Sequence, residues 1–410
     1  MSGLRFHLAL LLLSLATLIA GGFQGAKSEQ QAEQQGEEAQ ELPPIKVDDP
    51  RHQRDIDFDV ERGAEIAAWI KENYEFTENE AYIERVSRIG GELGKIAREN
   101  RVEATYGDTR LNPFNYQFFV LKGEEVNAFS VPGGYIYIYE GLIDFSETDS
   151  ELAGVIAHEI AHASFRHLNE LRKAQNNLSL ATIPAIIAAL FSKSPDAGAI
   201  IIGTQLYTQG MMSTWSVQAE KSADYGGIQY LVLSRYSPLG ALTFMERLDY
   251  RRRFKPQIKW GIYETHPPSD ERARTVLQNL AYYNVPLRRS LVTTSLRAVS
   301  KKLDDRTELW FGSQLIHTMG GPDAEERADR AVAKLNTFYD AVPALFELSL
   351  RNGSDIYGMN RKLFSVTEAD AWAVDLSTEE VVGIARSAMK KSVFNLAYRM
   401  WPARRRALAR

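Results

Sequence analysis

The sequence of 410 residues contains no cysteine. This absence excludes disulfide frameworks, iron–sulfur clusters, thiolate zinc sites, cysteine nucleophiles and lipidated cysteine anchors. Any metal site must therefore use nitrogen and oxygen ligands. Histidine is scarce as well, and the seven histidines are His7, His52, His158, His162, His167, His266 and His317.

A strong charge of either sign is also missing. The 48 Lys and Arg residues stand against 53 Asp and Glu residues, which gives a net charge of −5 and argues against nucleic acid as a main partner. The apolar and charged fractions, 44% and 25%, are those of an ordinary globular protein. They exclude collagenous, largely disordered and polytopic membrane classes, and the length indicates two or three domains.

The N-terminus has the pattern of an export signal. Arg5 precedes an apolar run over 6–20, which is shorter than the ~20 apolar residues of a membrane span. The small residues Ala20, Gly21 and Gly22 then offer a cleavage site, so we predict a signal peptide over residues 1–22 and a periplasmic protein. The alternative is an uncleaved anchor, which leaves the chain membrane-associated on the outer side of the cytoplasmic membrane.

Composition and periodicity divide the rest of the chain. Residues 23–54 are rich in Gln, Glu and Pro and predict a disordered leader. Residues 55–285 predict a mainly helical domain with a small sheet, of α+β class, with strands at 118–121 and 135–139 and helices at 148–172 and 213–234.

An apolar insert at 178–206 interrupts this domain and is too short to cross a bilayer. We favour a buried helical hairpin here; the alternatives are a flap over a cleft or a surface that contacts a membrane.

The last third of the chain has a different sequence pattern. Strand-like and helical runs alternate over 286–403, which predicts a separate small α/β domain, with an α+β arrangement also open. No repeat of fixed period occurs in it. Residues 404–410 form a basic end, for which a solvated tail is the simplest interpretation.

One stretch carries most of the chemical information. His158-Glu159-Ile-Ala-His162 places two histidines one helical turn apart, so both imidazoles can reach one metal ion. Glu159 lies beside the same site, where it can take a proton from an activated water. The flanking residues are strongly apolar, and buried histidines require a partner. This pattern predicts one zinc ion per chain.

A third ligand must be histidine or a carboxylate. A catalytic zinc takes three protein ligands and keeps a fourth position open. Glu220 and Asp224 lie one turn apart in the second strong helix, so Glu220 can bind metal while Asp224 holds a ligand imidazole by its other ring nitrogen.

The HExxH motif and the Glu220/Asp224 pair together resemble a known family. The HExxH motif with Glu220-x-x-x-Asp224 is similar to the gluzincin metallopeptidases that include HtpX and the CAAX prenyl protease. The resemblance extends to Asn127-Ala128-Phe129 with Pro132-Gly133-Gly134, and to Thr265-His266-Pro267-Pro268 with Glu271-Arg272. It covers roughly residues 55–280 and is strongest to the BepA-like periplasmic branch, except that the C-terminal third lacks the helical repeats of that branch.

The resemblance implies roles for further residues. Asn127, Ala128 and Phe129 would form an edge strand onto which an extended substrate pairs. His266 and Arg272 would lie near the open zinc position and bind an oxyanion, or His266 would occupy the metal in a latent state. His167 is expected to be structural, because on a continuous helix it lies away from the face of His158 and His162.

These features predict an exported zinc endopeptidase that cleaves unfolded or misassembled envelope proteins. Two other classes remain open. One is a chaperone or assembly factor for envelope proteins whose zinc site is largely latent. The other is a binding module whose zinc is structural and closed by four protein ligands.

Overall fold

The computed structural model describes residues 45–174, 214–254, 266 and 270–400. The predicted signal peptide, most of the leader, the apolar insert and the basic end lie outside the described residues. Among the described residues, no helix is long and apolar enough to cross a membrane.

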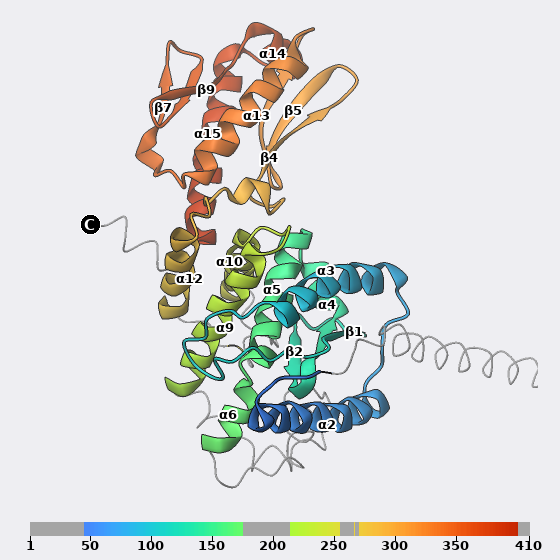
Figure 1. Cartoon of the computed structure of the whole chain (residues 1–410). Helices are drawn as coiled ribbons and strands as arrows, with labels where there is room; N and C mark the ends of the chain where they lie inside the picture. The colour runs from blue at the N-terminus through green and yellow to red at the C-terminus, as the bar shows by residue number, and fades with distance from the viewer. Residues whose placement is uncertain (1–44, 175–213, 255–265, 267–269, 401–410) are drawn as a thin grey trace, which may run out of the picture.

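The first two thirds of the chain form a helical unit around one small sheet (Figure 1). Its helices are α2 (Pro50–Asn73), α3 (Glu80–Glu99), α4 (Glu140–Phe145), α5 (Asp149–Ser164), α6 (His167–Ala174), α9 (Thr214–Val232), α10 (Leu239–Phe254) and α12 (Asp270–Tyr282). Its strands are β1 (Gln117–Leu121), β2 (Ala128–Val131) and β3 (Tyr135–Tyr139). The predicted α+β class and both predicted strands are confirmed.

The sheet has the order β1-β3-β2, so β2 lies at an edge. Strand β3 pairs in parallel with β1 and antiparallel with β2. The tight connection between β2 and β3 requires a left-handed backbone at Gly133 (φ 78°), which only glycine adopts without steric cost.

Helix α5 is the centre of this unit and is buried along nearly its whole length. Its N-cap is Thr148, whose hydroxyl accepts from the Glu151 amide, and its apolar faces pack against α3, α9 and α10. Gly154 permits close approach to α10, because a Cβ at this position would lie 2.7 Å from the Ala241 backbone. The helix that carries the histidines is therefore fixed on several sides.

Two predicted boundaries in this unit are wrong. The leader was expected to extend through residue 54, but α2 begins at Pro50 and is capped by the Asp49 carboxylate, which accepts from the Arg51 amide at 2.8 Å. The helix expected over 148–172 is broken at Phe165 and Arg166, between α5 and α6, where Arg166 has a positive φ of 55°.

Residues 296–400 form a second unit with its own apolar core. It contains the antiparallel sheets β4-β5-β6 and β7-β8-β9, with α13 (Ala324–Asp340), α14 (Glu368–Trp372) and α15 (Thr378–Arg399) (Figure 1). The strands are β4 (Ala298–Lys302), β5 (Arg306–Phe311), β6 (Gln314–Gly320), β7 (Leu348–Arg351), β8 (Asp355–Gly358) and β9 (Arg361–Ser365). Because all these ladders are antiparallel, the unit is α+β, which is one of the two arrangements that the sequence left open; the other, α/β, is wrong.

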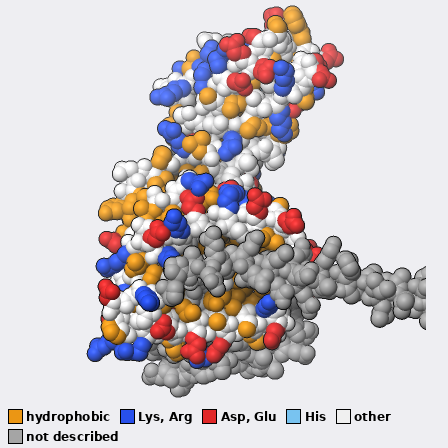
Figure 2. All heavy atoms as spheres, turned by 45° about the vertical axis from the view of Figure 1, so that its right-hand side comes forward, with side chains coloured by type: hydrophobic (Ala, Val, Ile, Leu, Met, Phe, Trp, Pro, Cys, Tyr) orange, Lys and Arg blue, Asp and Glu red, His pale blue; other side chains and the backbone are white. Residues whose placement is uncertain are grey.

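The two units meet where α15 ends beside α10 (Figure 1). The Arg399 guanidinium lies 5.3 Å from the ring centroid of Tyr250 and donates to the Ser295 carbonyl at 2.7 Å. Figure 2 shows positive and negative side chains interspersed over the visible face of both units.

Substitution of Gly154 by alanine tests the close packing of α5. We expect Gly154→Ala to lower the free energy of unfolding by about 1–3 kcal/mol, because the new methyl group must displace the α10 backbone. Gly91→Ala is the matched control: Gly91 is exposed on α3 with open space around it, so this change should stabilise by about 0.5–1 kcal/mol. Urea unfolding measures both, and an equal effect of the two substitutions would contradict this account.

Candidate metal centre

Three side chains from two helices converge at the middle of the helical unit. Helix α5 places His158 and His162 on one face, with their Nε2 atoms 3.0 Å apart. Glu220 reaches them from α9, with Oε2 3.3 Å from His158 Nε2 and Oε1 3.3 Å from His162 Nε2. With His266, these residues form a group whose ligand atoms lie within 4.8 Å of one another.

The protonation pattern shows how this group could accept a metal cation. Asp224 Oδ1 lies 3.0 Å from His158 Nδ1, and an ionised carboxylate only accepts, so the ring proton resides on Nδ1. Burial alone would lower the pKa of His158, but its hydrogen bonds to Asp224 and Glu220 raise it to about 10, so without a metal ion Nε2 also carries a proton, which faces Glu220. A metal cation would take the place of this proton, and Nε2 would then present its lone pair to the ion beside His162 and Glu220.

The spacing of the group also fits zinc. Ligands at about 2.0–2.1 Å from a tetrahedral zinc ion lie about 3.4 Å from one another. The nitrogen and oxygen atoms here are 3.0–3.3 Å apart. The donor set of two imidazoles and one carboxylate is thus suited to zinc in both chemistry and size.

Arg272 of α12 lies behind the carboxylates and is almost completely buried. It donates to both oxygens of Asp224 at 2.8 Å, and its Nη1 lies 2.9 Å from Glu220 Oε2. Burial alone would raise the pKa of Asp224, but Arg272 and His158 lower it to about 2. Burial would raise the pKa of Glu220 too, but the charges of His266 and Arg272 hold it well below its usual range, so Asp224 and Glu220 both remain charged acceptors.

This position differs from the one expected for Arg272, which was the open side of the zinc. The guanidinium instead faces the two carboxylates and the His266 carbonyl, 3.3 Å from Nη1. Its placement is suited to orienting Glu220 and Asp224 rather than to binding an oxyanion.

Glu159 occupies the position that the motif predicted, beside the convergent group. It is 1% exposed, and its Oε2 accepts from the Ser130 hydroxyl at 3.2 Å. Its Oε1 lies 3.3 Å from His266 Nε2. The sequence did not lead us to predict Ser130 as a site residue, although its hydroxyl, in the otherwise apolar run 128–131, was a signal for it.

The residues of the expected substrate-binding strand lie beside this carboxylate. Ala128 and Phe129 belong to the edge strand β2, and Asn127 directly precedes it. All three side chains are buried, and the Phe129 ring stacks on Tyr137 at 5.1 Å. The side chains of these three residues thus belong to the core.

The remaining described histidines divide into two groups. His52 bonds Asn112 at 2.8 Å and His317 bonds Asp370 at 3.0 Å, so both have structural partners away from the site. His167 instead contacts a site residue, because its Nδ1 lies 2.9 Å from His162 Nδ1. This contact was not predicted, because we expected His167 to lie on the same continuous helix as His158 and His162.

Comparison with known proteins agrees with this geometry. Residues 93–280 match Peptidase family M48. The chain therefore carries an M48 peptidase domain. M48 is a family of zinc metallopeptidases, and the M48 domain contains both α5 and α9. The predicted resemblance to gluzincin peptidases is confirmed.

Relatives of the M48 domain come from bacteria and from mitochondria. The Beta-barrel assembly-enhancing protease of Escherichia coli O157:H7 is 35% identical over 160 residues, which is 38% of this chain and 33% of the relative. Metalloprotease LoiP of Escherichia coli K12 is 28% identical over 50% of this chain and 72% of its own length. Mitochondrial metalloendopeptidase OMA1 of Schizosaccharomyces pombe is 26% identical over 40% of this chain and 47% of its own length. The match thus covers about a third of the first of these relatives, and it is consistent with the predicted BepA-like branch.

Removal of the metal should destabilise the M48 domain. A ligand at 100 times its Kd stabilises the folded state by about 2.7 kcal/mol, which for a domain of this size corresponds to a Tm change of roughly 5–11 °C. We therefore expect a chelator to lower the Tm by that amount and zinc to restore it, as measured by scanning calorimetry. A His158→Ala/His162→Ala double variant is the control and should show no chelator effect; an unchanged wild-type Tm would contradict the site.

Proposed function

We propose that this protein is an exported zinc-dependent endopeptidase whose Glu159 acts as the general base. The observation that carries the proposal is the placement of a buried carboxylate directly beside a group of two imidazoles and a carboxylate that fits zinc. Among the described residues, Glu159 Oε1 accepts no hydrogen bond, although His266 Nε2 lies 3.3 Å from it, so a water or substrate proton would reach Oε1 beside this imidazole.

The ligand roles we assign are His158, His162 and Glu220. Zinc bound there would acidify a water and polarise the scissile carbonyl. Glu159 would take the proton as the water attacks and deliver it to the leaving amine. The Ser130 hydroxyl, 3.2 Å from Oε2, would hold this carboxylate toward the site.

Asp224 and Arg272 would act from behind the ligands. Asp224 fixes the ring proton of His158 on Nδ1, and Arg272 braces Asp224 and Glu220 together. Such partners orient ligands and typically account for 10–100-fold in metal affinity or activity.

The edge strand β2 supports extended polypeptides as the substrate class. An extended chain can add to a free strand edge through main-chain hydrogen bonds, which do not depend on side-chain sequence. Ser130 of this strand contacts Glu159, so a chain paired there would pass beside the base. This arrangement favours unfolded proteins over folded ones as substrates.

The cellular setting we propose combines two observations. Residues 1–22 have the composition of a secretory signal, and one relative is named for beta-barrel assembly. We infer that the substrates are unfolded or misassembled envelope proteins in the periplasm. Contact of residues 178–206 with a membrane surface is part of this proposal.

A second candidate function is an envelope chaperone or assembly factor with a largely latent zinc site. The position of His266 favours it, because Nδ1 lies 3.0 Å from Glu220 Oε1 and 3.3 Å from His158 Nε2. An imidazole there can take the fourth metal position that catalysis requires to be open.

Substitution of Glu159 tests the proposed reaction. We expect Glu159→Gln to lower hydrolysis of casein by about 10²–10⁴-fold while zinc content stays at one ion per chain, because only the proton acceptor is lost. Glu99→Gln is the control: Glu99 is exposed at the end of α3, so this change should leave hydrolysis unchanged. Equal activity of metal-loaded wild type and Glu159→Gln would overturn the assignment of the base.

The state of His266 separates the two candidate functions. If His266 holds the site latent, His266→Ala should raise casein hydrolysis several-fold with zinc content retained, and Glu159→Gln in the same chain should abolish the gain. A fall in hydrolysis would instead assign His266 to transition-state binding. The chaperone would be favoured if neither wild type nor His266→Ala hydrolysed casein and if the Glu159→Gln variant still supported assembly of envelope proteins.

A further inference from the structure

The chain breaks its helix immediately after the second histidine of the HExxH motif. On a continuous helix, a residue five positions beyond His162 would point about 140° away from it. Instead α5 ends at Ser164, Arg166 takes a left-handed backbone (φ 55°), and α6 begins at His167. The break returns His167 to the site, with its ring centroid 4.9 Å from that of His162.

The contacts of His167 determine which atoms carry protons. Its Nε2 lies 3.1 Å from the Tyr106 carbonyl, which only accepts, so Nε2 carries the ring proton. Its Nδ1 then presents a lone pair to His162 Nδ1 at 2.9 Å. His162 must therefore donate from Nδ1, which leaves the lone pair of its Nε2 directed toward His158 and Glu220.

The surroundings leave little freedom for this ring. His167 is 5% exposed, and the Tyr106–Asp108 loop packs directly against it. A Cβ at Gly107 would lie 2.8 Å from His167 Cδ2, and this glycine has a φ of 96°. The loop closes on the imidazole because glycine occupies that position.

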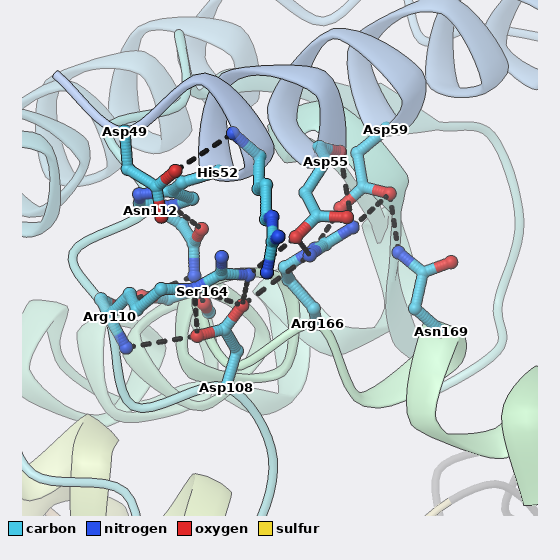
Figure 3. A network of polar contacts seen from close by, with 11 residues as sticks. Asp49, His52, Asp55, Asp59, Asp108, Arg110, Asn112, Ser164, Arg166 and Asn169 are labelled. Atoms are coloured by element: carbon cyan, nitrogen blue, oxygen red, sulfur yellow. Dashed lines mark hydrogen bonds and ion pairs between the residues drawn. The ribbon is translucent and has the colours of Figure 1, made fainter. Parts of the chain in front are cut away.

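A buried ion-pair network holds the break itself (Figure 3). Arg166 Nε donates to Asp59 Oδ2 at 2.5 Å and Nη2 to Asp59 Oδ1 at 3.1 Å, with Asp108 Oδ2 3.4 Å from Nη1. Asn169 of α6 donates to the same Asp59 carboxylate. A left-handed arginine is sterically unfavourable, so its contacts with Asp59 of α2 and Asp108 of the loop before β1 stabilise a turn that the local sequence does not favour.

We propose that His167 is a positioning residue for zinc binding: it fixes the proton and orientation of the His162 imidazole, and the Arg166–Asp59 ion pair holds the turn that brings it there. This inference rests on the proposed ligand role of His162. Metal-bound imidazoles generally donate their other ring N–H to such a partner, which fixes the ring and raises its basicity. Here the partner is a second histidine rather than a carboxylate or a backbone carbonyl.

Zinc affinity of His167 variants tests this proposal without reference to peptidase activity. His167→Phe keeps a ring of similar size but removes the acceptor, and we expect its zinc Kd, measured by competition with a chromogenic chelator, to rise 10–100-fold. His167→Gln supplies a carbonyl oxygen as acceptor and should return the Kd to within about three-fold of wild type. The visible absorption of the cobalt-substituted protein should change in His167→Phe and not in His167→Gln.

His317→Phe is the matched control, because His317 is also buried and bonds one side chain, Asp370, in the second unit of the chain. It should leave the zinc Kd and the cobalt spectrum unchanged. Wild-type affinity and spectrum in His167→Phe would overturn the proposal, as would equal losses in His167→Phe and His167→Gln when circular dichroism shows both to be folded. Failure of the wild type to bind zinc through His162, tested with His162→Ala, would instead overturn the proposed function.

Discussion

The convergence of buried acceptor atoms between α5 and α9 is the constraint on which the rest of the site depends. Two imidazole nitrogens of half-buried histidines lie 3.0 Å apart, and each lies 3.3 Å from an oxygen of the buried Glu220 carboxylate. Without a metal ion, a proton on His158 Nε2 pairs the ring with Glu220, because the two neighbouring carboxylates raise the pKa of this imidazole to about 10. A zinc ion bound there would displace this proton, so we expect metal binding to be coupled both to pH and to the stability of the M48 domain.

The side chains around the site contact the residues to which we assign metal binding. Asp224 Oδ1 lies 3.0 Å from His158 Nδ1, Arg272 contacts both Asp224 and Glu220, and His167 Nδ1 lies 2.9 Å from His162 Nδ1. Each partner comes from a different element, and α5 lies at their centre. The buried helix with its close glycine contact to α10 provides the rigidity that a defined metal geometry requires.

The sequence predicted the parts of the site that depend on one helical period. His158 and His162, and likewise Glu220 and Asp224, share a face because residues four apart do so on any helix. His167 could not be predicted in this way, because its position depends on an ion pair between Arg166 and Asp59, which are 107 residues apart. The position of Arg272 is a similar case: the family resemblance implied that it lies near the site, but not the side from which it approaches.

The fold also divides into features that the local sequence pattern predicted and features that it did not. Both strands of the first unit with strong apolar runs were predicted, whereas the N-terminal boundary was wrong because the polar segment 50–54 hid the Asp49-Pro50 cap of α2. In residues 296–400, alternating strands and helices suggested α/β, but the strands pair with their neighbours through tight turns. Gly312 (φ 55°) and Asn360 (φ 64°) lie in two of these turns, and the left-handed backbone that favours each hairpin was not used in the prediction.

X-ray absorption spectroscopy at the zinc edge, with metal analysis of the same sample, tests the central claim most directly. The account predicts one zinc ion per chain, bound only by nitrogen and oxygen atoms at about 2.0–2.1 Å, with at least two imidazoles that are lost in the His158→Ala/His162→Ala double variant. Substoichiometric zinc in the folded wild type, or a zinc shell that the double variant leaves unchanged, would contradict it.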